Sequence, residues 1–413
     1  MPRIHPKPEV FDGLLRLFPE ERDRLFRRRS RSGEAPEGRG YRVLSWRSSG
    51  AEYDQAVDGV LDRFRPRIEA AVREMAQAPV LLSEILEHPP EQWEGVARGG
   101  DRFRSLALCR LILDRSHEES VETPRRGERL ADLALTVIDW LDPARYGDRV
   151  LADARARAWT AIANARRVAA NLWGAEEAFR TAEEHLRRGM RDCLEKAQFL
   201  ELKACLRRAQ QRFPEAVRLF RRSISISLCT GQARSAAQAI MGLALAEQYR
   251  GEPERAIRLL ERANGLIDPG EDMRLYGCIY FNRILFLIDA GRLLEAQALL
   301  ARRPEAFRVL GEGVQLRVRW LEARIALALG RRAEAAALLD QVRKGFARRE
   351  DSYDAALASL ELAALYARIG KVEEAGRLAR EAQPIFQSLG IVREAIAASI
   401  VCQQTAAAER LAS

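Results

Sequence analysis

The residue types that carry out most enzymatic chemistry are present in this chain but are not grouped in a catalytic pattern. Its four histidines lie far apart in the sequence, at His5, His88, His117 and His185. No HExxH, GxSxG, P-loop or Rossmann glycine pattern occurs. The short turn at 311–313 contains two glycines, which is too little for a phosphate-binding loop. The sequence therefore predicts a non-enzymatic protein that uses no cofactor.

The six cysteines do not indicate a metal site or a set of disulfides. No two of them form a CxxC pair, and no histidine stands near them in a ligand pattern. We interpret them as small buried residues of a protein in a reducing compartment, and we expect no bound metal. They are Cys109, Cys193, Cys205, Cys229, Cys278 and Cys402.

A signal peptide or a membrane-spanning segment would indicate the compartment in which the protein works. The N-terminal sequence MPRIHPKPEVFDG has no apolar segment of the signal-peptide type. No apolar run reaches the roughly 18 residues that a membrane-spanning helix needs. We therefore expect a cytoplasmic protein with no membrane partner.

The formal net charge of +9 has two interpretations. Arginine accounts for 63 of the 68 basic residues, since lysine occurs only at Lys7, Lys196, Lys203, Lys344 and Lys371. This bias, together with abundant alanine, is typical of a GC-rich bacterial genome and then says little about function. The alternative is an attraction to acidic partners or to nucleic acid.

The elements that must position any binding residues are indicated by an alanine that recurs six times. Its spacings are 41, 40, 40, 39 and 40 residues. A large apolar residue stands four positions after five of the six alanines, which places both on one stripe of one helix. A fixed period of this size is the mark of a solenoid. The alanines are Ala175, Ala216, Ala256, Ala296, Ala335 and Ala375.

Each repeat is predicted to be a pair of helices separated by a tight turn. The turn residue lies five positions before the recurring alanine, and in four repeats it is glycine. Glycine there suits a left-handed cap at the end of the first helix. The six turn positions are Ala170, Gln211, Gly251, Gly291, Gly330 and Gly370.

We divide the chain into four parts. Residues 1–45 are a basic arm that we expect to be flexible, and 46–147 are an N-terminal helical region. The last helix pair of that region, at about 102–141, is interpreted as a degenerate repeat that caps the array. Six repeats follow at 148–390, and 391–413 form a final helix that shields the last repeat, as solenoid ends require.

Prolines divide the N-terminal helical region. A helical apolar stripe runs from Tyr53 to Val72, with Pro66 as a kink or break. A further apolar stretch follows Pro79 and ends at Pro89.

The spacing of the small and large apolar residues within each pair resembles that of the tetratricopeptide repeat. In the first repeat the matching residues are Trp159, Ile162, Ala163, Ala175, Phe179 and Ala182. The resemblance covers about 153–388, although the period is 40 rather than the 34 of the family. It is closest to a long-repeat subgroup found in bacterial regulators and scaffolds. It implies an all-α, right-handed superhelical solenoid of antiparallel helix pairs; a HEAT-like array is the structural alternative.

The resemblance also implies where a ligand would lie. In such repeats the first helix of each pair, helix A, lines a concave surface. In the first two repeats this face carries Arg157, Asn164, Arg167 and Arg208. Asparagine and arginine on neighbouring turns can hold an acidic side chain or a peptide carboxylate. The pattern resembles the carboxylate clamp of chaperone-binding members only in part, and a solvated polar face is the alternative.

The same face becomes apolar in the next repeats. Its residues there are Met241, Leu245, Phe281, Leu285 and Ile288, and Trp320 and Arg324 extend the surface into the fifth repeat. The stretch 276–288 is apolar on nearly every side, so such a helix should be buried on every side. Either the protein covers this helix itself, or the helix lines an apolar groove for a partner peptide or helix.

These features predict a protein-binding scaffold or adaptor that holds a peptide or helix of a partner in the concave groove. The alternative is a bacterial regulator linked to transcription or RNA, in which the repeats sense a peptide or protein signal. Its basic arm would contact nucleic acid through Arg27, Arg28, Arg29 and Arg31. No base-reading module is visible in the sequence, which makes this alternative the less favoured one.

Overall fold

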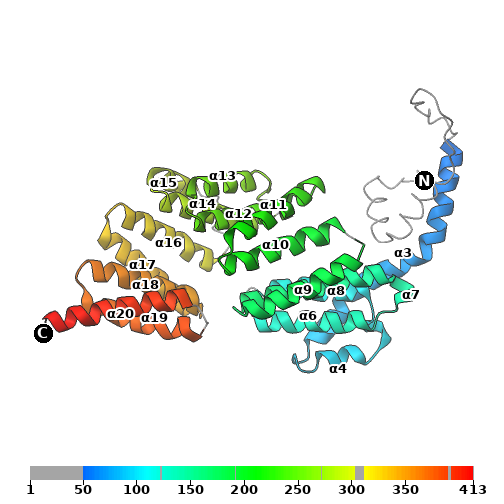
Figure 1. The fold of residues 1–413 in the computed structure, drawn as a ribbon, viewed down its shortest axis with the longest axis horizontal. Coiled ribbons are helices and arrows are strands. Elements are labelled where there is room, and N and C mark those ends of the chain that lie inside the picture. The colour runs from blue at the N-terminus through cyan, green and yellow to red at the C-terminus, as the bar shows by residue number, and fades with distance from the viewer. Residues whose placement is uncertain are drawn as a thin grey trace. The chain divides into compact units, whose positions relative to one another are not determined.

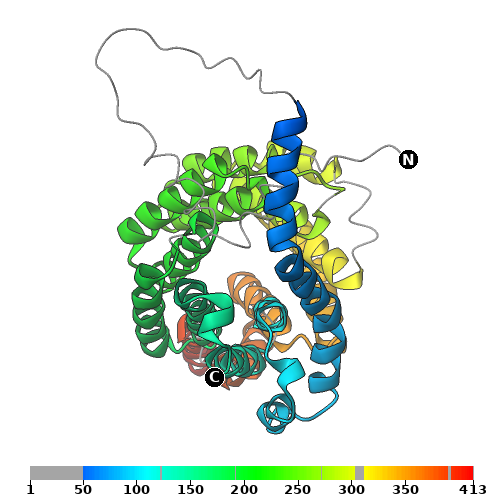
Figure 2. The same cartoon turned by 90° about the vertical axis from the view of Figure 1, so that its right-hand side faces the viewer.

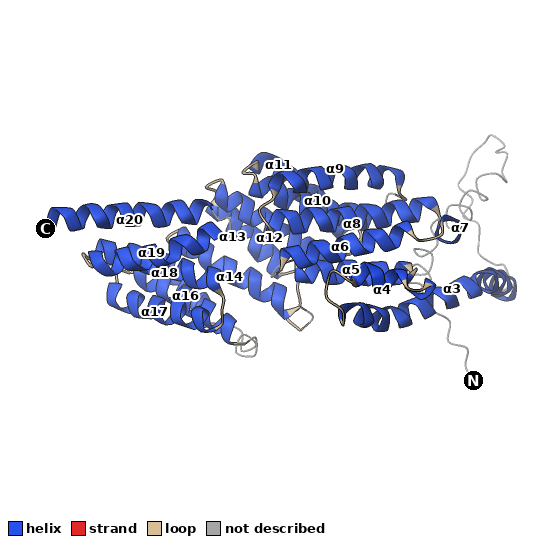
Figure 3. Ribbon diagram, turned by 90° about the horizontal axis from the view of Figure 1, so that it is seen from below, coloured by secondary structure: helices blue, strands red, loops and turns tan. Residues whose placement is uncertain are grey.

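The computed structural model describes residues 50–120, 123–190, 192–270, 272–302, 311–388 and 392–412. In these residues the backbone forms helices joined by turns, with no strand (Figure 3). The predicted all-α class is therefore confirmed. The chain divides into two compact units, residues 1–165 with 180–192 and residues 166–179 with 193–413.

The first unit contains the helices that precede the repeats. They are α3 (Gly50–Leu86), α4 (Trp93–Arg98), a 3-10 turn η1 (Asp101–Phe103), α5 (Leu106–Glu119), α6 (Pro124–Asp139) and α7 (Pro143–Tyr146). Helices α5 and α6 pack against each other, with Leu108, Ile112, Leu130 and Ile138 fully buried. The helix pair α8 (Asp148–Val168) and α9 (Leu172–Arg188) contributes residues to both units.

Of the predicted kink or break at Pro66, the break is wrong, because α3 continues through both Pro66 and Pro79. Each proline removes one backbone hydrogen bond from a helix and usually kinks or ends it. Both prolines are exposed to solvent in α3. Water can therefore bond the carbonyl groups that lose their partners, and the helix survives.

The second unit is an array of helix pairs, shown in order from green to red in Figures 1 and 2. Each helix packs on the next along the chain, both within the pairs and between them. The A helices are α10 (Cys193–Ala209), α12 (Ala233–Tyr249), α14 (Met273–Asp289), α16 (Glu312–Ala328) and α18 (Ser352–Arg368). The B helices are α11 (Phe213–Cys229), α13 (Pro253–Asn264), α15 (Leu293–Ala301), α17 (Arg332–Arg348) and α19 (Val372–Ser388).

The recurring alanine explains why these pairs pack closely. All six alanines of the series, from Ala175 to Ala375, are fully buried. The large residues four positions later, such as Phe179, Phe220 and Leu260, are fully buried as well. A small side chain at the helix crossing lets the backbones approach, and the large neighbour fills the space beside it.

The turns between the paired helices adopt the predicted left-handed conformation. Gly251, Gly291, Gly330 and Gly370 have φ between 74° and 82°. The first two repeats use Ala170 and Gln211 at the same place, with φ of 62° and 60°. The geometry of the turn is therefore kept even where its residue is not glycine.

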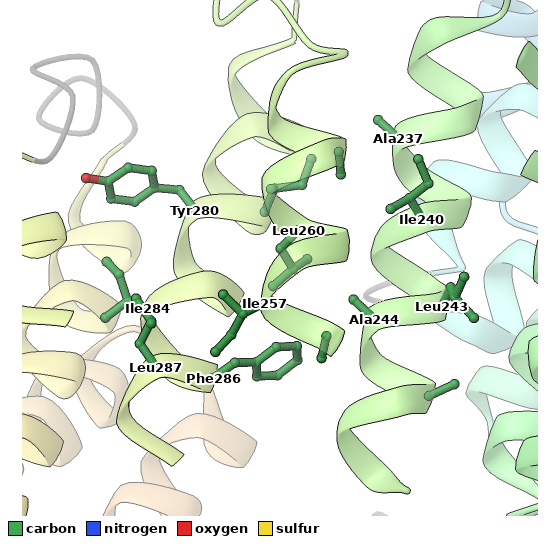
Figure 4. Close-up of a cluster of buried hydrophobic side chains, with 14 of the residues drawn as sticks. Ala237, Ile240, Leu243, Ala244, Ile257, Leu260, Tyr280, Ile284, Phe286 and Leu287 are labelled. Atoms are coloured by element: carbon green, nitrogen blue, oxygen red, sulfur yellow. The ribbon is translucent and has the colours of Figure 1, made fainter. Parts of the chain in front are cut away.

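Helix α14 lies in the middle of a continuous core cluster. Figure 4 shows side chains of this cluster that come from α12, α13 and α14. Helix α14 packs on α12, α13, α15 and α16, which explains why it is apolar on nearly every side. Ile279, Ile284 and Phe286 are almost completely buried in the cluster.

The last helix, α20 (Val392–Ala412), packs on α19 and α18 and covers the end of the array. Ala398 and Thr405 lie on its buried face. Ile396 and Ile400 are exposed by 55% and 48%, so they do not belong to the face that covers the last repeat.

Candidate functional site

A pocket with a volume of about 210 Å³ opens between three consecutive A helices of the second unit. We call it the α14–α16–α18 pocket. Its apolar lining comes from Phe281 and Leu285 of α14, Trp320 and Leu321 of α16, and Leu357 of α18. Charged residues that line it are Arg317, Arg324 and Asp354.

Helical spacing brings these side chains to one face. Phe281 and Leu285 are four residues apart and therefore share a face of α14. On α16, Arg317, Trp320 and Arg324 stand at i, i+3 and i+7, which places them on one stripe two turns long. The pocket is thus built from helical surfaces, so its shape is fixed by the packing of the helices.

Two ion pairs join α16 to α18 across the pocket. Arg317 donates from Nη2 to Oδ2 of Asp354 at 2.8 Å. Two turns further along, Arg324 is ion-paired with Glu361 and donates from Nε to Oε2 of that carboxylate at 3.3 Å. Both pairs connect residues 37 positions apart, so they have the same register between the two repeats.

Trp320 lines the pocket and is only 6% exposed. Its indole Nε1 donates to Oε2 of Glu361 at 2.8 Å, so the buried N–H has a partner. The Arg324 guanidinium lies over the indole ring at 5.5 Å from the ring centroid. Phe346 of α17 meets the same ring edge to face, with centroids 6.1 Å apart.

Burial raises the pKa of two carboxyl groups near the pocket. Burial raises the pKa of Asp354, and the charge of Arg317 opposes that rise. Burial also raises the pKa of Asp289 at the end of α14, against the charge of Arg324. Asp289 accepts a hydrogen bond at 2.9 Å from the side-chain amide of Gln248 on α12. Polar contacts therefore link neighbouring repeats on this face.

Four of the predicted apolar-face residues line this pocket: Phe281, Leu285, Trp320 and Arg324. Met241, Leu245 and Ile288 do not; they are partly buried and pack against the core cluster. For the stretch 276–288, the structure shows partial cover by the chain itself, and a groove for a partner stays a prediction. One side of the helix is buried by the chain, while Phe281 and Leu285 remain partly accessible.

The predicted polar-face residues are distributed over both units. In the first unit, Arg157 donates to Asp114 of α5 at 2.6 Å, and Asn164 is buried. In the second unit, Arg167 and Arg208 are partly buried. Burial lowers the pKa of Arg167, and the charge of Arg208 adds to that effect. Their role in binding stays a prediction.

The candidate nucleic-acid residues Arg27, Arg28, Arg29 and Arg31 lie outside the residues that the structure describes. Nucleic-acid contact therefore stays a prediction.

The sequence analysis missed four residues that line the pocket, Arg317, Leu321, Asp354 and Leu357, and it missed Glu361, which bonds two of the lining residues. The signal that could have found them is a cation on one A helix followed 37 residues later by an anion on the next. Arg317 with Asp354 and Arg324 with Glu361 both fit this rule. Such pairs stand out only once the repeats are aligned with each other.

A second hollow of about 350 Å³ lies beside α15, α16 and α17. Glu322, Arg331 and Glu334 contribute charged groups to it, and Leu300 and Ile325 contribute apolar ones. It is larger than the α14–α16–α18 pocket but contains none of the predicted binding residues. We therefore place the candidate site at the smaller pocket.

The described residues contain no group of three or more His, Cys, Asp or Glu side chains that could hold a metal ion. Among the same residues, no helix combines the length and the apolar character needed to span a membrane.

No protein-family model and no curated protein sequence matches this chain. Solved structures do resemble it. Aspartyl phosphate phosphatase F from Bacillus subtilis has a TM-score of 0.54 at 13% identity, covering 94% of this chain and 96% of its own. A Rap protein complexed with competence and sporulation factor has a TM-score of 0.52 at 14% identity, over 83% of this chain and 99% of its own. The apo form of RapI also has 0.52, at 12% identity, covering 68% and 99%.

Proposed function

We propose that this chain, which has a tetratricopeptide-repeat-like solenoid fold, is a non-enzymatic scaffold that binds a peptide segment of a partner protein. The segment would lie on the A helices of the second unit, with one side chain in the α14–α16–α18 pocket. The chain would then act as a regulator or adaptor through what it holds rather than through chemistry.

The observation that carries the proposal is the pocket itself. Its lining combines apolar side chains with charged groups, and all of them come from the helices that were expected to face a ligand. Binding sites are commonly concave and mostly apolar, with a few polar groups that fix orientation. Apolar anchors in such pockets dominate the affinity of peptide and protein interfaces.

The structural comparisons support the choice of ligand class. One protein of similar fold is described as a complex with a competence and sporulation factor. At 14% identity this likeness concerns the fold and does not carry over the ligand. It supports a bound factor as the kind of occupant that such an array accommodates.

The test is photo-crosslinking in the native host with a benzophenone amino acid at one of two positions. Phe281 lines the pocket, and Leu294 of α15, which is 79% exposed, is the matched control away from it. We expect a discrete covalent adduct with a partner protein from position 281 and none from position 294. Equal adducts from both positions, or an adduct from position 294 alone, would contradict the proposal.

A further inference from the structure

We infer that the α14–α16–α18 pocket selects an extended peptide segment by one large, uncharged apolar side chain. The two ion pairs that flank the pocket then hold the peptide backbone on either side of that side chain. This inference rests on the proposed function and adds the composition and conformation of the ligand.

The size and charge of the pocket decide what can enter it. Its volume of about 210 Å³ is below the roughly 300 Å³ at which sites for small-molecule ligands begin. A single large side chain is therefore the better match. The charged groups of the lining are already paired, Arg317 with Asp354 and Arg324 with Glu361. A charged side chain entering the pocket would lose water without gaining an unpaired counter-charge, which is unfavourable.

The two ion pairs are spaced along α16 and α18, with apolar lining residues between them in the sequence. Arg317 and Arg324 are seven residues apart on α16, and Asp354 and Glu361 are seven residues apart on α18. With a rise of 1.5 Å per residue, this spacing separates the two pairs by about 10.5 Å along the helices. Leu357 stands between Asp354 and Glu361 in sequence, and its side chain lines the pocket between the pairs.

Each ion pair keeps capacity for further hydrogen bonds. An arginine side chain has five N–H donors, and a carboxylate has about four acceptor positions. Asp354 uses one oxygen to accept from Arg317, so its other oxygen can accept a peptide N–H. The remaining N–H groups of the arginines can donate to peptide carbonyls. Each pair can therefore accept from one peptide N–H and donate to the carbonyl of a neighbouring peptide group.

The spacing of the pairs favours an extended ligand. An extended chain of the polyproline-II type rises about 3.1 Å per residue and has three residues per turn, so amides three residues apart lie on the same side of the chain and are separated by about 9 Å. This distance is close to the separation of the two ion pairs. A helical ligand has already used most of its backbone groups in internal hydrogen bonds and could not satisfy the pairs in this way.

The experiment begins with a displayed library of random linear decapeptides, selected on the full chain. Selected peptides are synthesised, and their affinities are measured by fluorescence polarisation against wild type, Leu285→Glu and Leu294→Glu. Each backbone amide of the peptides is then N-methylated in turn. A methylated amide at the peptide end provides the control for the modification itself.

We expect the selected peptides to share one large uncharged apolar residue. Leu285→Glu should weaken binding at least about tenfold, whereas Leu294→Glu should leave it unchanged. N-methylation of either of two amides flanking the shared residue should weaken binding about tenfold, the size expected for losing a hydrogen bond to a charged group.

The experiment distinguishes a failure of this inference from a failure of the proposed function. If peptides bind in a manner sensitive to Leu285→Glu but tolerate N-methylation at every amide, or share a charged anchor, the inference about the ligand is wrong and the proposed function stands. If no peptide is selected, or if all selected peptides ignore Leu285→Glu, the proposed function is wrong together with the inference.

Discussion

At the scale of single residues, Glu361 organises the polar side of the candidate site. Its carboxylate accepts from the Trp320 indole and pairs with Arg324, so one side chain orients two lining residues. A buried indole N–H without an acceptor would be costly. The site is therefore organised before any ligand arrives, which lowers the entropy lost on binding.

The buried carboxyl of Glu201 on α10 is expected to make the stability of the protein depend on pH. Its side chain is 8% exposed, and burial raises the pKa of its carboxyl to about 8, against the charge of Arg234 and a hydrogen bond from Gln238. The unfolded carboxyl titrates near 4.3. Between these values the folded chain holds a proton that the unfolded chain has lost, so stability falls as pH rises from about 4.3 to about 8.

We expect Glu201→Gln to remove this dependence. The variant should exceed wild type in free energy of unfolding by up to a few kcal/mol near pH 8, and the difference should shrink toward pH 5. Thermal denaturation followed by circular dichroism at both pH values measures it. Glu373→Gln, which changes an exposed carboxylate on α19, is the control. An equal difference between Glu201→Gln and wild type at both pH values would show that the carboxyl is not shifted.

At the scale of elements, the turn inside each repeat is set by backbone geometry. Four repeats place glycine at the left-handed position, while Gln211 adopts φ 60° there. A side chain in this conformation costs about 1–2 kcal/mol. Glycine avoids that cost. It also makes the unfolded chain more flexible, which lowers the free energy of unfolding by about 0.4–1 kcal/mol.

Gln211→Gly is therefore expected to stabilise the protein by about 0.5–1 kcal/mol, and Gly251→Ala to destabilise it by about 1 kcal/mol. Urea unfolding of both variants measures these changes. The two turns occupy equivalent places in neighbouring repeats, so each variant is the control for the other. Changes of the same sign in both variants would mean that the left-handed geometry does not determine the effect.

The helix pairs are the part of the fold that the sequence predicts best. The series from Ala175 to Ala375 depends on contacts within one pair, so its period is visible along the chain. The continuity of α3 through Pro66 could not be predicted in this way, since it depends on both prolines facing water. The exposure of Ile396 on α20 likewise depends on which face of the helix packs on α19.

At the scale of the whole molecule, the repeated architecture separates what holds the fold together from what can bind. Stability in a solenoid comes mostly from contacts between neighbouring repeats. The candidate site uses the same kind of contact, because its ion pairs join the A helices of successive repeats. A partner bound there would touch three repeats at once and would stabilise their stacking.

The site could be predicted only in part from the sequence. Phe281, Leu285, Trp320 and Arg324 were expected because each belongs to one face of one helix. Asp354 and Glu361 were not, because their significance lies in the pairing with arginines 37 residues earlier. A pattern within one repeat cannot reveal a pocket that forms between three of them.

The central claim is that a partner segment binds over the α14–α16–α18 pocket. Hydrogen exchange of the full chain, measured with and without a saturating peptide selected as described above, tests this claim most directly. The account predicts slower exchange in 273–289, 312–328 and 352–368, and unchanged exchange in the B helices α11 and α13. Slower exchange confined to the B helices, with the three A helices unchanged, would contradict it.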